Sequence, residues 1–164
     1  MPGIDPATSR ALSQRLAVEQ SDCRLPSAAA GLVRGGELVL ADAVGSIDGR
    51  SDGVASTVQT QFRLGSITNT FVAVEVLRMR DEGLLDLSDA VWRHLGDTPF
   101  GHITIAQLLS HTSGLQAETN GPWWERTTGG TWAELMAGKP ALKFRPGAKF
   151  HYSNVGYAVL GELI

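Results

Sequence analysis

The chain has 164 residues, 43% of them hydrophobic and 19% charged, which is enough for a globular domain with a sizeable core. Its 14 basic and 17 acidic residues give a net charge of −3 with no basic run, which argues against a nucleic-acid partner. The apolar runs are too short to span a bilayer, and the single cysteine, Cys23, excludes an internal disulfide.

The first twenty residues predict an amphipathic helix rather than a signal peptide. They contain no basic segment followed by a long apolar run, which a secretory leader needs. The helix is expected to begin near Ala7, with Leu12, Leu16 and Val18 on its inner side. We therefore expect a cytoplasmic protein, or a secreted one from which a leader has been removed.

A β-hairpin is predicted next. The apolar runs Ala28 to Val33 and Leu38 to Val44 flank the pair Gly35-Gly36, which can adopt the positive φ angles of a two-residue turn. Two strands do not make a stable sheet, and no later segment has the pattern of a third long strand. The hairpin is therefore expected to pair with strands from a C-terminal segment or from a second chain.

From Ser66 onward the pattern changes to that of helices. Ile67, Phe71, Val74 and Leu77 recur at helical spacing and predict one apolar side, and Gly83 is a natural stop. A short second helix is expected within 84–96, capped by Ser88 or Asp86. A third follows Thr104, and a fourth begins at Asn154 and has no visible end, which resembles a cut rather than a natural terminus.

Metal and cofactor sites are not indicated. The four histidines are too far apart for a helical metal motif, and the chain has no C-x-x-C pair. His111 is expected to cap the end of its helix, and His151 to flank a site rather than act in it. Trp123 and Trp124 either line a substrate cleft or anchor a loop in the core.

The segment "FRLGSITNTF", residues 62–71, places Ser66 directly after a glycine at the start of a helix. The helix dipole and backbone N–H groups at such a position stabilise negative charge. A lysine three residues later would lie on the same face and could take the proton of the hydroxyl, but that position holds Asn69, whose amide is no base. For this segment alone, Ser66 as a simple N-cap is the alternative.

Three segments together resemble the beta-lactamase-related serine hydrolases, which include class C beta-lactamases, D-alanyl-D-alanine carboxypeptidases, D-aminopeptidases and esterases. "FRLGSITNTF" is similar to their nucleophile segment, "LLSHTSGL" to the helix end that follows it, and "RPGAKFHYSNVGYAVLGELI" to their Tyr-x-Asn segment. The stretch "EGLLDLSDAV" also fits, and the segments occur in family order. The resemblance covers most of residues 62–164.

The resemblance implies an α+β fold of the beta-lactamase and penicillin-binding-protein type. Residues 1–164 would be the N-terminal part of a single domain, with a helix and hairpin in 1–60 and a mostly helical region in 61–164, truncated before the C-terminal strands. Ser66 would be the acylated nucleophile, and Tyr152 would relay protons between nucleophile and leaving group. Asn154 would contact the substrate, and Asn69 stands where the family has its lysine.

Two departures from the family pattern affect the expected activity. Asn69 supplies no positive charge, which a phenol with an ordinary pKa of about 10 needs before it can act as a base near neutral pH. The Lys-Thr-Gly-like motif, whose backbone would supply the second oxyanion donor, does not occur in the chain.

The function that the resemblance implies is acyl transfer. We expect it to act on a β-lactam, a D-amino-acid peptide or a small ester, and to be impaired by Asn69. The alternative is an inactive member or a fragment that binds ligand or pairs with a second chain.

Overall fold

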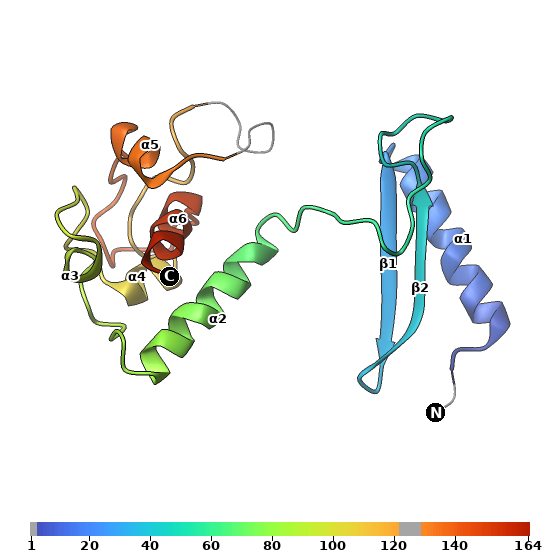
Figure 1. Cartoon of the computed structure of the whole chain (residues 1–164), viewed down its shortest axis with the longest axis horizontal. Helices are drawn as coiled ribbons and strands as arrows, with labels where there is room; N and C mark the ends of the chain where they lie inside the picture. The colour runs from blue at the N-terminus through green and yellow to red at the C-terminus, as the bar shows by residue number, and fades with distance from the viewer. Residues whose placement is uncertain (1–2, 122–128) are drawn as a thin grey trace. The chain divides into compact units, whose positions relative to one another are not determined.

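The computed structural model describes residues 3–121 and 129–164, and Figure 1 shows the order of the elements. The chain divides into two compact units, one ending at Arg63 and one beginning at Leu64. The first unit contains α1 (Pro6–Asp22), β1 (Ser27–Arg34) and β2 (Glu37–Gly45). The second contains the helices α2 (Ile67–Asp81), α3 (Trp92–Leu95), α4 (Ile105–Leu109), α5 (Trp132–Ala137) and α6 (Asn154–Leu163). Helices with a two-stranded sheet make this an α+β structure, as predicted.

The antiparallel pair β1–β2 confirms the predicted hairpin. Arg34 pairs with Glu37 at the turn, and Ser27 pairs with Gly45 at the far end. Gly35 and Gly36 have φ angles of 60° and 81°, the left-handed pair that a two-residue turn requires if its twist is to match that of the strands.

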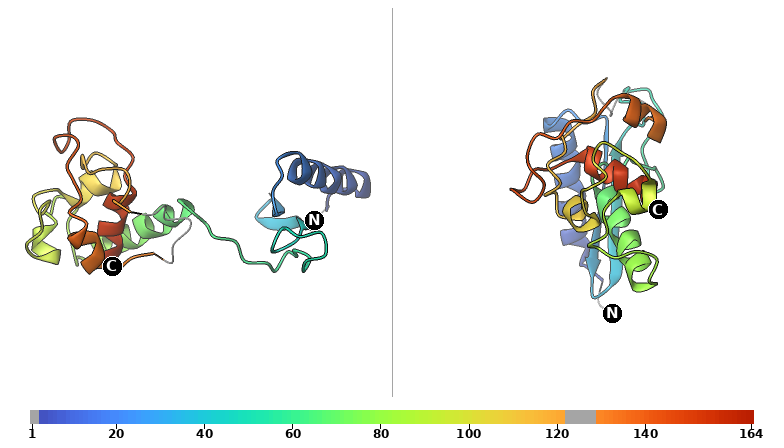
Figure 2. Two further views of the ribbon diagram at one scale, coloured as in Figure 1. Left: turned by 90° about the horizontal axis from the view of Figure 1, so that it is seen from above. Right: turned by 90° about the vertical axis from the view of Figure 1, so that its left-hand side faces the viewer.

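Helix α1 packs against the hairpin, as Figures 1 and 2 show. It begins at Pro6, one residue before the predicted start, because the Asp5 carboxylate caps it by accepting the backbone N–H groups of residues 7 and 8 at 3.0 Å. A hydrogen bond from the Ser13 hydroxyl lowers the pKa of Asp42 on β2 and links the helix to the sheet. The predicted inner side is wrong in part, because Leu12 and Val18 are exposed.

Helix α2 begins directly after Ser66 and ends at Asp81, close to the predicted bounds. Its end follows from Gly83, which has a φ of 73° and lets the chain turn away from the helix axis. The backbone N–H of Leu84 then donates to the carbonyl of Met79 at 2.9 Å, which satisfies one of the helix's last acceptors.

The apolar side predicted for α2 is not the side that packs on the core. Ile67, Phe71 and Val74 are 59%, 63% and 54% exposed. The helix instead contacts the core of the second unit through a stripe one residue removed, formed by Val72, Val76 and Met79. The helix is apolar on more than one side, so the 3.6-residue period predicts a helix without selecting the face that packs.

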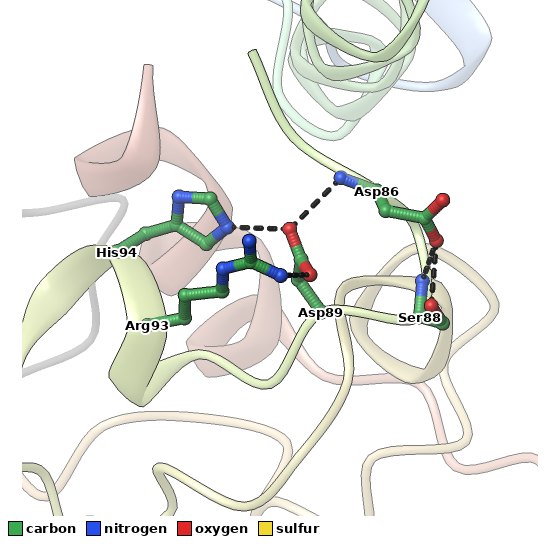
Figure 3. A network of polar contacts seen from close by, with 5 residues as sticks. All are labelled: Asp86, Ser88, Asp89, Arg93 and His94. Carbon is green, nitrogen blue, oxygen red and sulfur yellow. Dashed lines mark hydrogen bonds and ion pairs between the residues drawn. The ribbon is translucent and has the colours of Figure 1, made fainter. Parts of the chain in front are cut away.

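A polar network joins the turn before α3 to the helix itself, and the turn explains why this helix is shorter than predicted (Figure 3). The buried Asp89 carboxylate accepts the backbone N–H of Asp86 at 2.9 Å and pairs with Arg93 at 2.6 Å and His94 at 2.9 Å. The Asp86 carboxylate accepts the N–H and hydroxyl of Ser88, closing a turn rather than capping a helix. The bond from Asp86, then those from His94 and Arg93, lower the pKa of Asp89.

Among residues 3–121 and 129–164, the hydrophobic core is formed by the second unit. Helix α6 packs against α2, α3 and α4, and Figure 2 gives two further views of this group. Thr104 caps α4 with a capping box completed by Gln107, as the predicted start requires. The buried apolar side chains are Val76, Leu85, Val91, Phe100, Ile103, Ile105, Leu108, Leu115, Val155, Val159, Leu160 and Leu163.

Candidate active site

Ser66 occupies the N-cap position of α2, but its side chain does not cap the helix. Gly65 has a φ of 56°, and Ser66 itself is already helical, with φ −70° and ψ −5°. An N-cap serine normally has extended backbone, from which its oxygen reaches the second or third backbone N–H. The exposed Ser66 hydroxyl is therefore not used for capping, and it lies at the positive end of a 15-residue helix.

Asn69 is brought against Tyr152, which lies 83 residues later in the chain. The Asn69 Nδ2 group donates a hydrogen bond to the Tyr152 hydroxyl oxygen at 2.8 Å. Asn69 is half-buried, and its backbone N–H bonds to the Ser66 carbonyl at 3.0 Å, so the two residues share the first turn of α2. Residues three apart on a helix lie on the same face.

Asn154 is placed against Glu118, a residue that sequence reasoning missed. The Asn154 Nδ2 group donates to Glu118 Oε1 at 2.8 Å, and the Asn154 backbone N–H donates to the carbonyl of Ala117 at 2.8 Å. Nothing in the residues around Glu118 distinguishes it as a partner. No sequence pattern links Glu118 to Asn154, which lies 36 residues later in the chain.

The residue that caps α6 is Ser153. Ser153 is fully buried; its hydroxyl donates to the carbonyl of Gln116 at 2.7 Å and accepts the Gly156 N–H at 2.9 Å. Asn154 becomes the first helical residue. Its side chain is held by Glu118.

The segment 111–117, which contains all of "HTSGL", is the scaffold for the tyrosine segment. The Gly114 carbonyl accepts the N–H groups of Lys143 and Phe144 at 2.8 and 3.2 Å, and the Gly147 N–H donates to Thr112 at 2.8 Å. Main-chain hydrogen bonds therefore place residues 143–154 along residues 111–117. Two of the three segments that carry the family resemblance are joined in this way.

The C-cap of α4 is Ser110 rather than the predicted His111, whose ring faces the tyrosine segment. His111 lies beyond α4 with a φ of 55°, and its ring centroid is 4.3 Å from that of Tyr152 and 4.9 Å from that of Tyr157. Burial lowers the pKa of His111 below 6.5 and raises that of Tyr157 above 10.0. His151 packs its ring against Phe144, 4.9 Å away.

In residues 3–121 and 129–164, no group of three His, Cys, Asp or Glu side chains is arranged to hold a metal ion. Over the same residues, no helix has both the length and the apolar character needed to cross a membrane. Cys23 is exposed. Trp123 and Trp124, predicted to line a cleft or anchor a loop, lie outside the described residues.

Comparison with known proteins supports the resemblance seen in the sequence. Protein flp of Staphylococcus aureus (strain COL) is 28% identical over 148 residues, which cover 85% of this chain and 30% of flp. A solved structure of SurE with D-Leu is 31% identical with a TM-score of 0.72, covering 97% of this chain and 36% of SurE. The chain thus spans about a third of the length of these relatives.

A D-amino acid amidase from Ochrobactrum anthropi SV3, complexed with L-phenylalanine amide, shares the fold. It is 24% identical with a TM-score of 0.79, over 94% of this chain and 43% of the amidase. The predicted beta-lactamase and penicillin-binding-protein-like fold is thereby confirmed. The family model described as Beta-lactamase matches residues 9–164, nearly the whole sequence, and the chain therefore belongs to the Beta-lactamase family.

Proposed function

We propose that this chain carries the nucleophile half of a serine hydrolase site that works by acyl transfer through Ser66. The observation that supports this most is the hydrogen bond of 2.8 Å from Asn69 Nδ2 to the Tyr152 hydroxyl oxygen. It joins the helix turn that contains Ser66 to the tyrosine segment, which is the neighbourhood that nucleophilic catalysis by a serine needs.

In the proposed reaction, Ser66 Oγ forms a bond to the substrate carbonyl carbon. Tyr152 relays the proton, since its oxygen accepts the serine proton while its own hydroxyl proton passes to the leaving amine or alkoxide. The bond to the leaving group breaks, and an ester on Ser66 remains. Water then attacks that ester, its proton returns through Tyr152 to Ser66, and the acid is released. Asn154 would contact the substrate through its amide.

Asn69 limits the rate of the proposed acyl transfer. Its amide donates a hydrogen bond to the Tyr152 oxygen but carries no charge, so it stabilises a developing phenolate only weakly. A lysine ammonium at this position would add a full positive charge in the same place. The proposed activity is therefore slow, and Asn69 is its main impairment.

The proposed substrate class is based on the ligands and activities named for the relatives. SurE was solved with D-Leu, and the Ochrobactrum anthropi protein is a D-amino acid amidase. We propose a small amide or ester whose acyl group is a D-configured amino acid, with β-lactams and other small esters as the remaining substrates of the same chemistry.

A second candidate is a family member that binds such ligands without turnover, or a fragment that pairs with a strand-bearing segment or a second chain. The contact between Asn69 and Tyr152 favours it, because an uncharged donor occupies the position of the base. The first unit has a two-stranded sheet, β1–β2, whose outer edges could pair with such strands.

Hydrolysis of a matched pair of D- and L-phenylalanine p-nitroanilides tests the proposal. We expect slow release of p-nitroaniline that favours the D-isomer and is lost in Ser66→Ala. Calorimetric binding of the D-isomer without release would select the ligand-binding candidate. Equal release in Ser66→Ala, or neither binding nor release by folded protein, would contradict both.

A further inference from the structure

His111 makes three separate contacts with the tyrosine segment. Its carbonyl accepts the backbone N–H of His151 at 2.7 Å, and its Nδ1 accepts the backbone N–H of Ser153 at 3.1 Å. Between these two hydrogen bonds, its ring lies 4.3 Å from the Tyr152 ring at an interplanar angle of 31°. One residue therefore holds the backbone on both sides of Tyr152 and one face of its ring.

The surroundings of His111 fix the ring itself. Tyr157 lies on it at 4.9 Å and 35°, and Phe150 approaches edge-on at 5.6 Å and 75°. The Tyr157 hydroxyl donates to the Leu109 carbonyl at 3.1 Å, which anchors that side of the aromatic group. A ring enclosed in this way has few alternative rotamers, so its Nδ1 stays directed at Ser153.

The protonation state follows from the hydrogen bond. A backbone N–H can only donate, so His111 Nδ1 must present a lone pair and the ring proton must be on Nε2. Burial lowers the pKa of His111, which keeps the ring neutral and the acceptor available near neutral pH.

We propose that His111 is a positioning residue that holds Tyr152 in contact with Asn69 through the acceptor at Nδ1. The inference rests on the proposed function for the role of Tyr152, but the contact itself can be measured whether or not Ser66 reacts. Without the acceptor, the Ser153 N–H loses its partner, and the backbone next to Tyr152 can shift. The phenol then no longer lies 2.8 Å from the Asn69 amide.

Two substitutions separate the acceptor from the ring. His111→Asn places an amide oxygen close to the position of Nδ1, and asparagine tolerates the positive φ of 55°. His111→Phe keeps an aromatic ring against Tyr152 but has no acceptor. Tyr152→Phe serves as the reference for a lost contact, because it removes only the hydroxyl that Asn69 binds.

The side-chain amide signals of Asn69 in a ¹⁵N–¹H NMR spectrum provide the readout. We expect His111→Asn to leave these signals at their wild-type positions and His111→Phe to move them to the positions seen in Tyr152→Phe. Wild-type signals in His111→Phe would overturn the proposal, as would a loss in His111→Asn as complete as that in His111→Phe. Retention of the contact in His111→Asn, which removes the ring but keeps the acceptor, is a result that a general packing role does not produce.

A second measurement uses the wild-type protein and reports the tautomer of His111. The ring nitrogen shifts of wild-type His111, assigned against the other three histidines, are expected to show the proton on Nε2. A proton on Nδ1 would overturn the proposal.

The rate at which a fluorophosphonate labels Ser66 provides a kinetic test. Where Ser66 reacts, this rate is expected to fall about 10- to 100-fold in His111→Phe and to recover in His111→Asn. Absence of any reaction bears on the proposed function and leaves the NMR result intact.

Discussion

Asn69→Lys is expected to raise the rate of Ser66 acylation by about 10²- to 10⁴-fold, the range typical of general acid–base help. Asn69 Nδ2 already lies 2.8 Å from the Tyr152 hydroxyl oxygen, so the position is within reach of the proton relay. A lysine there replaces an uncharged donor with an ammonium, which favours negative charge on the tyrosine oxygen. As a desolvated amine, it can also take the Ser66 proton directly.

The rate constant for labelling by a fluorophosphonate, followed by intact mass, is the measurement. Asn69→Met is the matched control, because the methionine side chain is nearly as long as that of lysine but has no charge and no hydrogen-bond donor. The double variant Ser66→Ala/Asn69→Lys shows that the label is on Ser66. Equal rates in the lysine and methionine variants would contradict the assignment of this position to the base.

Gly114→Ala is expected to destabilise the second unit by more than about 4 kcal/mol, a loss that only a few mechanisms produce. An added Cβ would lie 2.1 Å from the Phe144 carbonyl oxygen, and the φ of 78° is unfavourable for alanine in any case. The obstacle is backbone rather than a flexible side chain. The two segments that align at Gly114 would therefore have to separate, and Tyr152 would move with them.

Gly83→Ala is the matched control for that substitution. Its φ of 73° is nearly the same, but no atom lies within 4 Å of the added Cβ, so only the conformational cost of about 1–2 kcal/mol applies. Urea unfolding followed by tryptophan fluorescence compares the two, since all four tryptophans follow Leu64 in the sequence. Equal losses of stability would show that the close contact at Gly114 contributes nothing.

Local signals predicted several elements correctly because their causes are local. The pair Gly35-Gly36 determines its turn by φ alone, Thr104 caps α4 with its own side chain, and Gly83 ends α2. Helix α5 was missed although its signal was present, since Thr131 and Glu134 form a capping box that the glycines before it obscured.

Features that depend on distant residues could not be derived in the same way. The face of α2 that packs is decided by the helices of the second unit, not by its own period. Asn69 and Tyr152 were connected only through the family resemblance, because no local pattern joins residues 83 apart. Glu118 and the ring of His111 face the site only because residues 143–154 align on residues 111–117.

Intact mass after incubation with a fluorophosphonate tests most directly whether Ser66 is a nucleophile. We expect one phosphonyl group to be added to the chain, located on Ser66 by peptide mapping and lost in Ser66→Ala. A parallel incubation with penicillin reports whether a β-lactam acylates the same residue. An unmodified mass from a chain shown to be folded, or an adduct that persists in Ser66→Ala, would show that Ser66 is not the nucleophile.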